Sequence, residues 1–464
     1  MRHVFYDTET TGTETAFDQI LQFGAILTDD SFNELDVMNE RCRLSPHIVP
    51  SPVALLVTDV SVAQLTKQEK SHYEFMRAVQ QKLQDWGPAC FIGYNSVNFD
   101  EQLLRQSLYK TLGDVFLTNT QGNTRGDIMR MVHAASVYAP NALAIPMSDT
   151  GRQVFKLDRL APANGIDHGE AHDALADVRA TIEIARLLRD RAPEVWQRCL
   201  SATNPNAAKK LLQEAEYVSV NDNFFGKNYT WLVAYAGTNP EYDKQVAVFD
   251  LSFRPEDYLD LDVPDLIDVM NRTPKAIRAV KTNAQPTIMP SAMHPDVGAA
   301  SRFSAEELSR RARMIAVAPE FQRRVGQALV QRFTEEEPSE HVERRIYDDF
   351  PTPADKDRMT RFHDADWPRR VEIANEIEDP RYRELAIRLI HAERPEALPE
   401  STRSTYDEWL SRRLTTNEDV PWRTLRQALR EADDRLQSAS GEERQHLLGI
   451  RTFLEEVASK HEPA

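Results

Sequence analysis

Residues 2–12, RHVFYDTETTG, join a run of strand-forming residues to two closely spaced carboxylates. Side chains alternate between the two faces of a strand, so Asp7 and Glu9 are expected to project from the same face. Two such carboxylates repel each other unless cations lie between them, and hard divalent ions such as Mg²⁺ prefer oxygen ligands of this kind. Gly12 would let the next turn bring backbone N–H groups close to a ligand. Asp-x-Glu is common in acidic proteins, so the pair alone does not define a site.

The residues around this stretch have the pattern of a mixed α/β domain. Further strands are predicted in ILQFGAILTDD (20–30), CRLSP (42–46) and CFIGYN (90–95). Helices are predicted over 72–86, 100–112 and 171–190, the last with Asp173 placed to cap its first turn. Strands followed by helices indicate a three-layer domain that ends near residue 195.

A third carboxylate, Asp100, follows the predicted strand in GYNSVNFD (93–100). It lies where a helix begins, so its side chain is placed to face the same metal ions as Asp7 and Glu9. The alternative is that Asp100 only caps the helix that starts at Glu101.

The segment HDALAD (172–177) supplies a histidine and a fourth carboxylate. Asp177 lies inside the predicted helix and is placed to bind a metal ion, while His172 lies just before the helix. Histidine suits a general base because its ordinary pKa of about 6.5 is close to working pH. The alternatives are a solvent-exposed Asp177, an incidental His172 and a purely capping role for Asp173.

Taken together, these motifs and their order resemble the Asp-Glu-Asp-Asp exonuclease superfamily, in its histidine-containing branch. The resemblance implies an RNase H-like α/β fold and hydrolysis of a terminal phosphodiester with two Mg²⁺ ions, for which Mn²⁺ would substitute. It makes Asp7, Glu9, Asp100 and Asp177 the metal ligands and His172 the general base. The products would be nucleoside 5′-monophosphates.

The chain continues well beyond such a domain. SATNPNAAKK (201–210) is predicted to be a linker or the entry to a further domain. NYTWLVAYAG (228–237) and KQVAVFDLSF (244–253) are predicted strands joined by a turn, and IRAVKTNAQPTIMP (277–290) is predicted to add a strand pair. Residues 304–333 and nearly everything after 341 are predicted to be helical.

This order of regions resembles the exodeoxyribonuclease I family, most clearly in the stretches FDQILQFGAILTD, GYNSVNFDEQLLR, GKNYTWLVAYAGTNP and VKTNAQP. The resemblance implies an RNase H-like exonuclease domain (1–195), an SH3-like β module with trailing helices (200–335) and a C-terminal helical domain (341–464). These domains would close a clamp around single-stranded DNA and make its 3′→5′ degradation processive, in DNA repair and recombination.

The resemblance also suggests contacts to substrate and partner. Glu9 would bind the terminal nucleotide as well as metal, Lys156 stands where the family usually has arginine, and Arg105 and Arg125 are candidates for the DNA backbone. Single-stranded DNA-binding protein would bind through its acidic tail, and the basic candidates for that site are Arg310, Arg311, Arg313, Arg323 and Arg324. A solvated helix face is the alternative for these arginines. Three aromatic residues could stack bases, but burial in the core is expected for them: Phe116, Tyr229 and Trp231.

The bulk composition bounds these expectations. The chain has 464 residues, 41% hydrophobic and 28% charged, which fits about two to four globular domains. The net charge of −17 argues against nucleic-acid binding unless a basic groove is present locally. The sequence shows neither a signal peptide nor an apolar membrane segment, and Cys42, Cys90 and Cys199 form no zinc or disulfide pattern. A cytoplasmic monomer is expected.

Two other functions stay open from the sequence. An RNA 3′ exonuclease of the same superfamily would share the catalytic motifs, because discrimination of RNA depends on contacts to the 2′-hydroxyl. A non-catalytic scaffold that binds single-stranded DNA would use a degenerate nuclease fold. The presence of all five candidate catalytic residues speaks against the scaffold.

Overall fold

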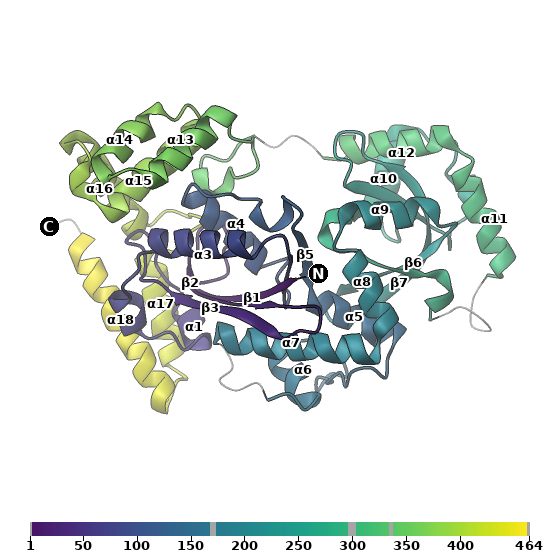
Figure 1. Ribbon diagram of the computed structural model, residues 1–464, viewed down its shortest axis with the longest axis horizontal. Helices are drawn as coiled ribbons and strands as arrows, with labels where there is room; N and C mark the ends of the chain where they lie inside the picture. Colours follow the sequence, from purple (N-terminus) through teal and green to yellow (C-terminus); the bar gives the residue numbers. More distant parts are fainter. Residues whose placement is uncertain (1, 168–172, 296–302, 334–336, 462–464) are drawn as a thin grey trace.

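The computed structural model describes residues 2–167, 173–295, 303–333 and 337–461. Figure 1 shows a central α/β region built on β1 to β5, with a second sheet and its helices on one side and the C-terminal helices on the other. We call these the N-terminal region (β1 to α8), the middle region (α9 to α12) and the C-terminal region (α13 to α18). Among the described residues, no helix is both long and apolar enough to cross a bilayer.

The N-terminal sheet has the strand order β3-β2-β1-β4-β5. Strands β1, β2 and β3 pair antiparallel, whereas β1, β4 and β5 run parallel. Along β1, Phe5 belongs to the core on one face of the sheet, and Val4 and Tyr6 belong to the core on the other. The strands are β1 (His3–Thr10), β2 (Ile20–Thr28), β3 (Glu34–Arg41), β4 (Cys90–Gly93) and β5 (Thr124–Asp127).

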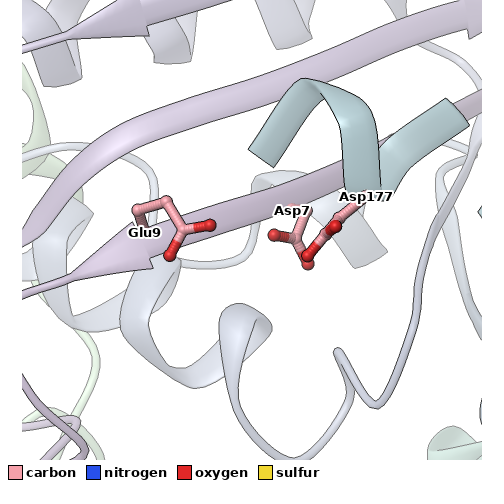
Figure 2. Close-up of side chains that lie close together, drawn as sticks. All are labelled: Asp7, Glu9 and Asp177. Atoms are coloured by element: carbon pink, nitrogen blue, oxygen red, sulfur yellow. The ribbon is translucent and has the colours of Figure 1, made fainter. Parts of the chain in front are cut away.

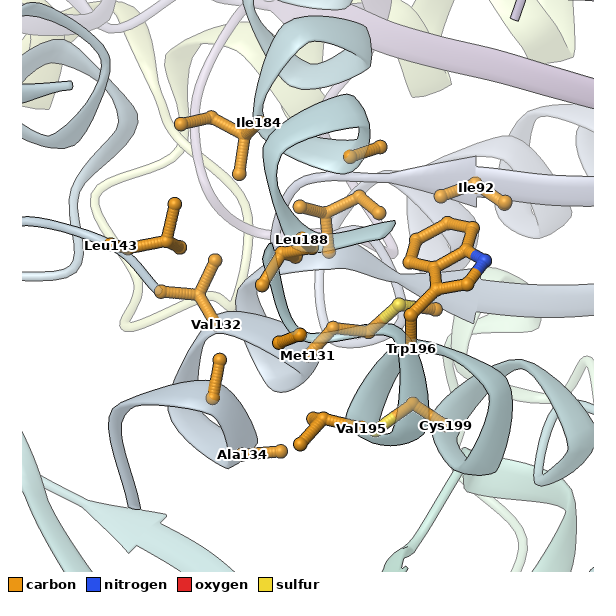
Figure 3. Packing of buried hydrophobic residues seen from close by; sticks show 14 of the residues in the cluster. Ile92, Met131, Val132, Ala134, Leu143, Ile184, Leu188, Val195, Trp196 and Cys199 are labelled. Atoms are coloured by element: carbon orange, nitrogen blue, oxygen red, sulfur yellow. The ribbon is translucent and has the colours of Figure 1, made fainter. Parts of the chain in front are cut away.

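Helices cover both faces of this sheet, with α3 and α4 on one face and α7 on the other (Figure 1). Figure 3 shows the core beneath α5, α7 and α8, where Met131, Leu188 and Trp196 pack together below Ile92 of β4. The predicted three-layer α/β fold is therefore confirmed. The helices of this region are α1 (Pro52–Val57), α2 (Val62–Lys67), α3 (His72–Trp86), α4 (Asp100–Lys110), α5 (Ile128–Tyr138), α6 (Leu157–Ala163), α7 (Ala174–Arg191) and α8 (Pro193–Ser201).

The middle region contains an antiparallel sheet with the order β10-β6-β7-β8-β9. Helix α9 packs on one face, and α10 to α12 pack on the other through a core that includes Phe249 and Phe321. The elements are α9 (Pro205–Glu214), β6 (Val218–Phe224), β7 (Lys227–Thr238), β8 (Gln245–Asp250), α10 (Val263–Asn271), β9 (Ile277–Lys281), β10 (Thr287–Pro290), α11 (Ala305–Ala316) and α12 (Pro319–Gln331).

The C-terminal region is helical, as predicted, and it packs against the N-terminal region through two cores. One core joins Tyr73 and Tyr109 to the first helices of the region, and the other joins Leu55 of α1 to α16, α17 and α18. The helices are α13 (Pro353–Asp364), α14 (Trp367–Glu376), α15 (Pro380–Glu393), α16 (Glu400–Thr415), α17 (Leu425–Leu436) and α18 (Gly441–His461).

The structure corrects two predictions about elements and decides a third between its alternatives. CRLSP is not a strand, because the third strand is the preceding Glu34–Arg41. Of the two alternatives for SATNPNAAKK, the segment is not a linker but leads into the middle region: Asn204 caps α9, and Pro205 occupies its first turn. Strands β9 and β10 are present but do not pair, since they lie at opposite edges of the second sheet.

All three cysteines, Cys42, Cys90 and Cys199, are free and buried. Burial raises the pKa of the Cys42 and Cys199 thiols to about 12 and that of Cys90 to about 11. They therefore act as small apolar residues of the N-terminal core.

Candidate active site

Strand β1 and helix α7 bring three carboxylates together. Asp7 and Glu9 lie on the same face of β1, and Asp177 lies in the first turn of α7. One carboxylate oxygen of each residue lies within 4.8 Å of one from each of the other two. Figure 2 shows the Asp7 and Asp177 carboxylates turned toward each other, with Glu9 next to them along the strand. The structure therefore brings these three side chains together, as predicted.

The approach of α7 to the sheet depends on Gly24. This residue is the neighbour of Asp7 on β2, and a Cβ atom there would come within 2.7 Å of the backbone of Ala174 and Leu175. A glycine inside a strand often marks such a close backbone approach. Any side chain at position 24 would push away the first turn of α7, which carries Asp177.

The start of α7 is fixed by Asp173, as predicted. Its carboxylate accepts hydrogen bonds from the backbone N–H groups of Leu175 and Ala176, which cap the helix. The same side chain accepts from Gln22 at 2.9 Å and pairs with Arg41 at 2.8 Å. Asp173 therefore ties the helix to β2 and β3.

Asp100 lies beside the three-carboxylate group but is not one of its members. It is the first residue of α4, whose N-cap is Phe99, and its carboxylate accepts a 2.6 Å hydrogen bond from the Thr8 hydroxyl. Its charge acts on Asp7, where it is the largest contribution after burial to the raised pKa of that carboxyl. Asp100 thus approaches the group from the α4 side of the sheet.

The electrostatics of the site favour bound cations. Burial, followed by the charges of Asp100, Asp177 and Glu9, holds the pKa of Asp7 well above its ordinary value. Burial, followed by the charge of Asp177, raises the pKa of Glu9 to about 9. A raised carboxyl pKa means that the surroundings stabilise the charged form poorly, and a divalent ion with oxygen ligands would stabilise that form. The donor set of the site therefore fits hard divalent metal ions.

The other predicted site residues are distributed differently. His172 lies outside the described residues. Lys156 is exposed just before α6. Arg105 and Arg125 are both largely buried, and their guanidinium groups pair with the buried Glu101 at 2.7 Å and 3.1 Å. This arrangement favours a structural role for both arginines, and their contact with DNA stays a prediction.

The surface residues singled out from the sequence also differ from expectation. Tyr229 was expected in the core but is 38% exposed, and it stacks on the partly buried Trp231 with ring centroids 6.1 Å apart. Phe116 is partly buried and packs against Phe350. All five arginines of α11 and α12 have protein partners: Arg310, Arg311, Arg313, Arg323 and Arg324.

Sequence reasoning missed several residues that build the site. Gly24 lies in the predicted strand ILQFGAILTDD, and a glycine inside a strand is a sign that another backbone approaches closely. Thr8 lies between the two carboxylates of β1 but has no pattern of its own. Glu101 follows Asp100 directly, and nothing in the sequence indicates that two arginines converge on it.

The three-layer fold and its carboxylate group define the class of the protein, which is that of the metal-dependent exonucleases. The family described as Exonuclease matches residues 4–185, and the family described as Exonuclease I C-terminal domain matches residues 340–457. These two matches, together with curated relatives named exodeoxyribonuclease I, place the chain in the exodeoxyribonuclease I family. An exonuclease domain of this kind depends on a divalent metal, and the acidic group on β1 and α7 fits that requirement.

Known relatives agree with this placement. Exodeoxyribonuclease I of Escherichia coli is 28% identical over 77% of this chain and 78% of the relative. The crystal structure of E. coli exonuclease I in complex with a dA16 oligonucleotide superposes with a TM-score of 0.85 at 22% identity, over 98% of this chain and 99% of that one. Exonuclease I from Methylocaldum szegediense superposes with a TM-score of 0.83 at 25% identity over the same shares of both chains.

Proposed function

We propose that this protein is a 3′→5′ exonuclease that degrades single-stranded DNA to nucleoside 5′-monophosphates. The observation that carries the proposal is the convergence of Asp7, Glu9 and Asp177 on an exonuclease fold. The substrate class comes from the relatives, which are exodeoxyribonucleases, one of them solved with a DNA oligonucleotide.

The proposed cofactor is a pair of Mg²⁺ ions, for which Mn²⁺ would substitute. Asp7, Glu9 and Asp177 would hold them, with Asp100 reaching the site from the opposite face of the sheet. Bound there, two such ions would neutralise charge on the scissile phosphate and would acidify the attacking water.

The chain's own residues would do the rest. His172 would accept the proton of the attacking water, because it precedes Asp177 by five residues and a histidine titrates near working pH. Glu9 would contact the terminal nucleotide, and the exposed Lys156 would contact a phosphate as a point charge.

A basic groove lined mainly by the middle region supports a nucleic-acid substrate in spite of the net charge of −17. The groove has a volume of about 420 Å³ and lies between α5 and the second sheet. Among its described lining residues the carboxylate is Asp222 alone, against five cationic side chains: Arg130, Lys275, Arg278, Lys281 and Arg332.

Aromatic side chains add stacking surface to this groove. Phe224 and Trp231 line it, and Tyr229 stacks on Trp231 at its edge. The Arg278 guanidinium lies 3.7 Å from the centre of the Trp231 ring. Positive charge next to aromatic faces suits a single strand, whose phosphates and unpaired bases can both be bound. We propose that the strand leaves the nuclease site along this groove.

The remaining assignments follow from the resemblance. We propose three domains with boundaries at 1–195, 200–335 and 341–464, which would close a clamp around the DNA and make its degradation processive. The protein would act in DNA repair as a cytoplasmic monomer. It would bind the acidic tail of single-stranded DNA-binding protein, although the protein partners of Arg310 and the other arginines of α11 and α12 leave less positive charge for that tail.

The test is a cleavage assay with 5′-labelled single-stranded DNA, matching RNA and duplex DNA, each with Mg²⁺ or with EDTA. Asp177→Asn removes a candidate metal ligand at constant shape, and Asp190→Asn makes the same change at an exposed position of α7. Shortening of single-stranded DNA from its 3′ end by the wild type and Asp190→Asn, only with metal and not by Asp177→Asn, supports the proposal. Equal degradation of RNA would assign a different substrate, and binding without cleavage would assign a scaffold.

A further inference from the structure

A loop of the middle region reaches into the N-terminal region. It comprises Thr282–Ala284, a short 3₁₀ helix after β9, and Gln285, which adopts a left-handed backbone conformation with φ of 47°. Gln285 is 3% exposed. Its Oε1 atom accepts a 2.7 Å hydrogen bond from the backbone N–H of Asp127, and its Nε2 atom donates to the carbonyl of Cys199 at 3.4 Å.

The two residues before Gln285 make similar contacts through their backbone. The carbonyl of Asn283 accepts from the Arg125 guanidinium at 3.1 Å, and the carbonyl of Ala284 accepts from Arg130 at 2.8 Å. Three consecutive residues of the loop therefore bind three residues at β5 and the start of α5.

Each of those three residues in turn holds the segment that leads to Asp100. The Asp127 carboxylate accepts hydrogen bonds from the backbone N–H groups of Asn95 at 3.0 Å and Val97 at 3.3 Å. The Arg130 guanidinium donates to the side chain of Asn98 at 3.2 Å. Arg125 pairs with Glu101, which also accepts from the Tyr6 hydroxyl at 3.0 Å.

This segment, residues 95–101, has internal backbone hydrogen bonds but is also held from outside. Asn95 has a φ of 62°, and the segment is neither strand nor helix until Asp100. Backbone N–H groups in such a turn need acceptors, and the buried Asp127 carboxylate supplies those of Asn95 and Val97. The position of Asp100 therefore depends on Asp127, and the Asp127 N–H depends on Gln285.

We infer that Gln285 is a positioning residue of the active site and that the middle region completes the metal site. Through Asp127, it fixes the 95–101 segment so that Asp100 lies beside the carboxylates of β1. Arg125 and Arg130 carry the same coupling from the neighbouring carbonyls. This inference rests on the proposed function for its catalytic consequence, but its structural part concerns the protein without metal or DNA.

The test compares Gln285→Met with Gln322→Met. Methionine is unbranched and has about the same length as glutamine, so Gln285→Met removes the two side-chain hydrogen bonds with little change of shape. Gln322→Met makes the identical change elsewhere in the middle region, where the Gln322 amide donates to the carbonyl of Ile315 at 2.9 Å. Gln285→Asn is a third variant; asparagine tolerates the left-handed conformation but is one methylene too short to reach Asp127.

Two measurements are made on each variant. Hydrogen–deuterium exchange of the metal-free, DNA-free protein follows the amides of residues 93–100. Cleavage of single-stranded DNA is then titrated with Mg²⁺ to give the half-saturating metal concentration and the maximal rate.

We expect faster exchange of residues 93–100 in Gln285→Met and Gln285→Asn, but not in Gln322→Met. We also expect a rise of about tenfold in the half-saturating Mg²⁺ concentration, the lower end of the usual effect of losing a partner behind a metal ligand. Wild-type exchange and wild-type metal dependence in both Gln285 variants would overturn the inference. If the wild type cleaves no DNA, the proposed function fails, and the exchange data still decide whether Gln285 positions the segment.

Discussion

The hydroxyl of Thr8 donates a 2.6 Å hydrogen bond to the carboxylate of Asp100, on the face of β1 opposite to Asp7 and Glu9. Alternation along the strand thus places the carboxylates of Asp7 and Glu9 on one side and the support of Asp100 on the other. The site is assembled around the strand itself, because α7 delivers Asp177 to one face and α4 delivers Asp100 to the other.

Thr8→Val should weaken metal binding without changing the shape of the strand. The variant removes the hydrogen bond that orients Asp100, and loss of such a partner typically costs about 10–100-fold in metal affinity or activity. The measurement is a Mg²⁺ titration of single-strand cleavage. Thr66→Val, which changes an exposed threonine of α2, serves as the control. An unchanged titration curve for Thr8→Val would show that Asp100 needs no support from β1.

Metal ions should stabilise the fold through the same carboxylates. The wild type should gain roughly 2.7 kcal/mol of unfolding free energy when the metal concentration is 100 times its Kd, provided that only the folded state binds. Asp177→Asn removes one repelling charge, so its metal-free form should unfold at a higher temperature than the metal-free wild type. Mg²⁺ or Mn²⁺ should then raise its unfolding temperature by less. Thermal unfolding with and without metal tests this, with Asp190→Asn as the control. A full metal response in Asp177→Asn would exclude Asp177 as a ligand.

Glu101→Gln should destabilise the protein strongly. Glu101 is buried and pairs with two largely buried arginines, and removing one partner of a buried ion pair typically costs about 3–5 kcal/mol. Denaturant unfolding is the measurement, and Glu183→Gln, at an exposed position of α7, should stay close to the wild type. A small stability change with a large loss of DNA affinity would instead return Arg105 and Arg125 to the role of DNA contacts.

The basic groove should contribute to the salt dependence of DNA binding. Lys281 is exposed on the groove. Its replacement by glutamine should make the negative slope of log K against log salt shallower by about 0.7, the value for one phosphate contact on a single strand. Arg313→Gln, a similar change in the same region but outside the groove, should leave the slope unchanged. Equal slopes for Lys281→Gln and the wild type would place the DNA elsewhere. Binding is measured with the inactive Asp177→Asn background.

Acid stability should depend on His72, which lies between the N-terminal and C-terminal regions. Burial lowers the pKa of His72 from 6.5 to about 3. Between these two pH values, His72 is protonated in the unfolded chain but stays neutral in the folded protein, which favours unfolding. Its contribution to stability is complete above pH 6.5 and is lost as the pH falls toward 3. His72→Phe should flatten the acid limb of a plot of stability against pH. Burial also lowers the pKa of His47, so the His72→Phe variant should still lose some stability at acidic pH.

Much of the N-terminal region could be predicted from the sequence, because its elements carry local signals. Residues 72–86 were predicted to be helical from their periodicity, and they form α3 with a capping box at Ser71. The convergence of Asp7, Glu9 and Asp177 followed from strand alternation and motif order. These signals reside in the side chains themselves and need no knowledge of distant contacts.

The missed elements lacked such signals. Strand β3 is an edge strand whose first four residues are exposed, so its sequence shows no alternation of apolar and polar residues. The Asn-Pro pair before α9 resembles a linker but caps a helix. The segment between β9 and β10 looked like a hairpin turn, whereas Gln285 turns it away to contact Asp127. Of these three cases, only Gln285 has its decisive partner far away in the sequence, because Asp127 is 158 residues before it.

The burial of every native cysteine has a practical consequence. Maleimide dyes react with thiolates, and Cys42, Cys90 and Cys199 are both shielded and hard to ionise. A single cysteine introduced at Phe225, which is 95% exposed in the turn between β6 and β7, would therefore be labelled selectively. Fluorescence from that position would follow the arrival and departure of individual strands at the groove while all native thiols stay in place.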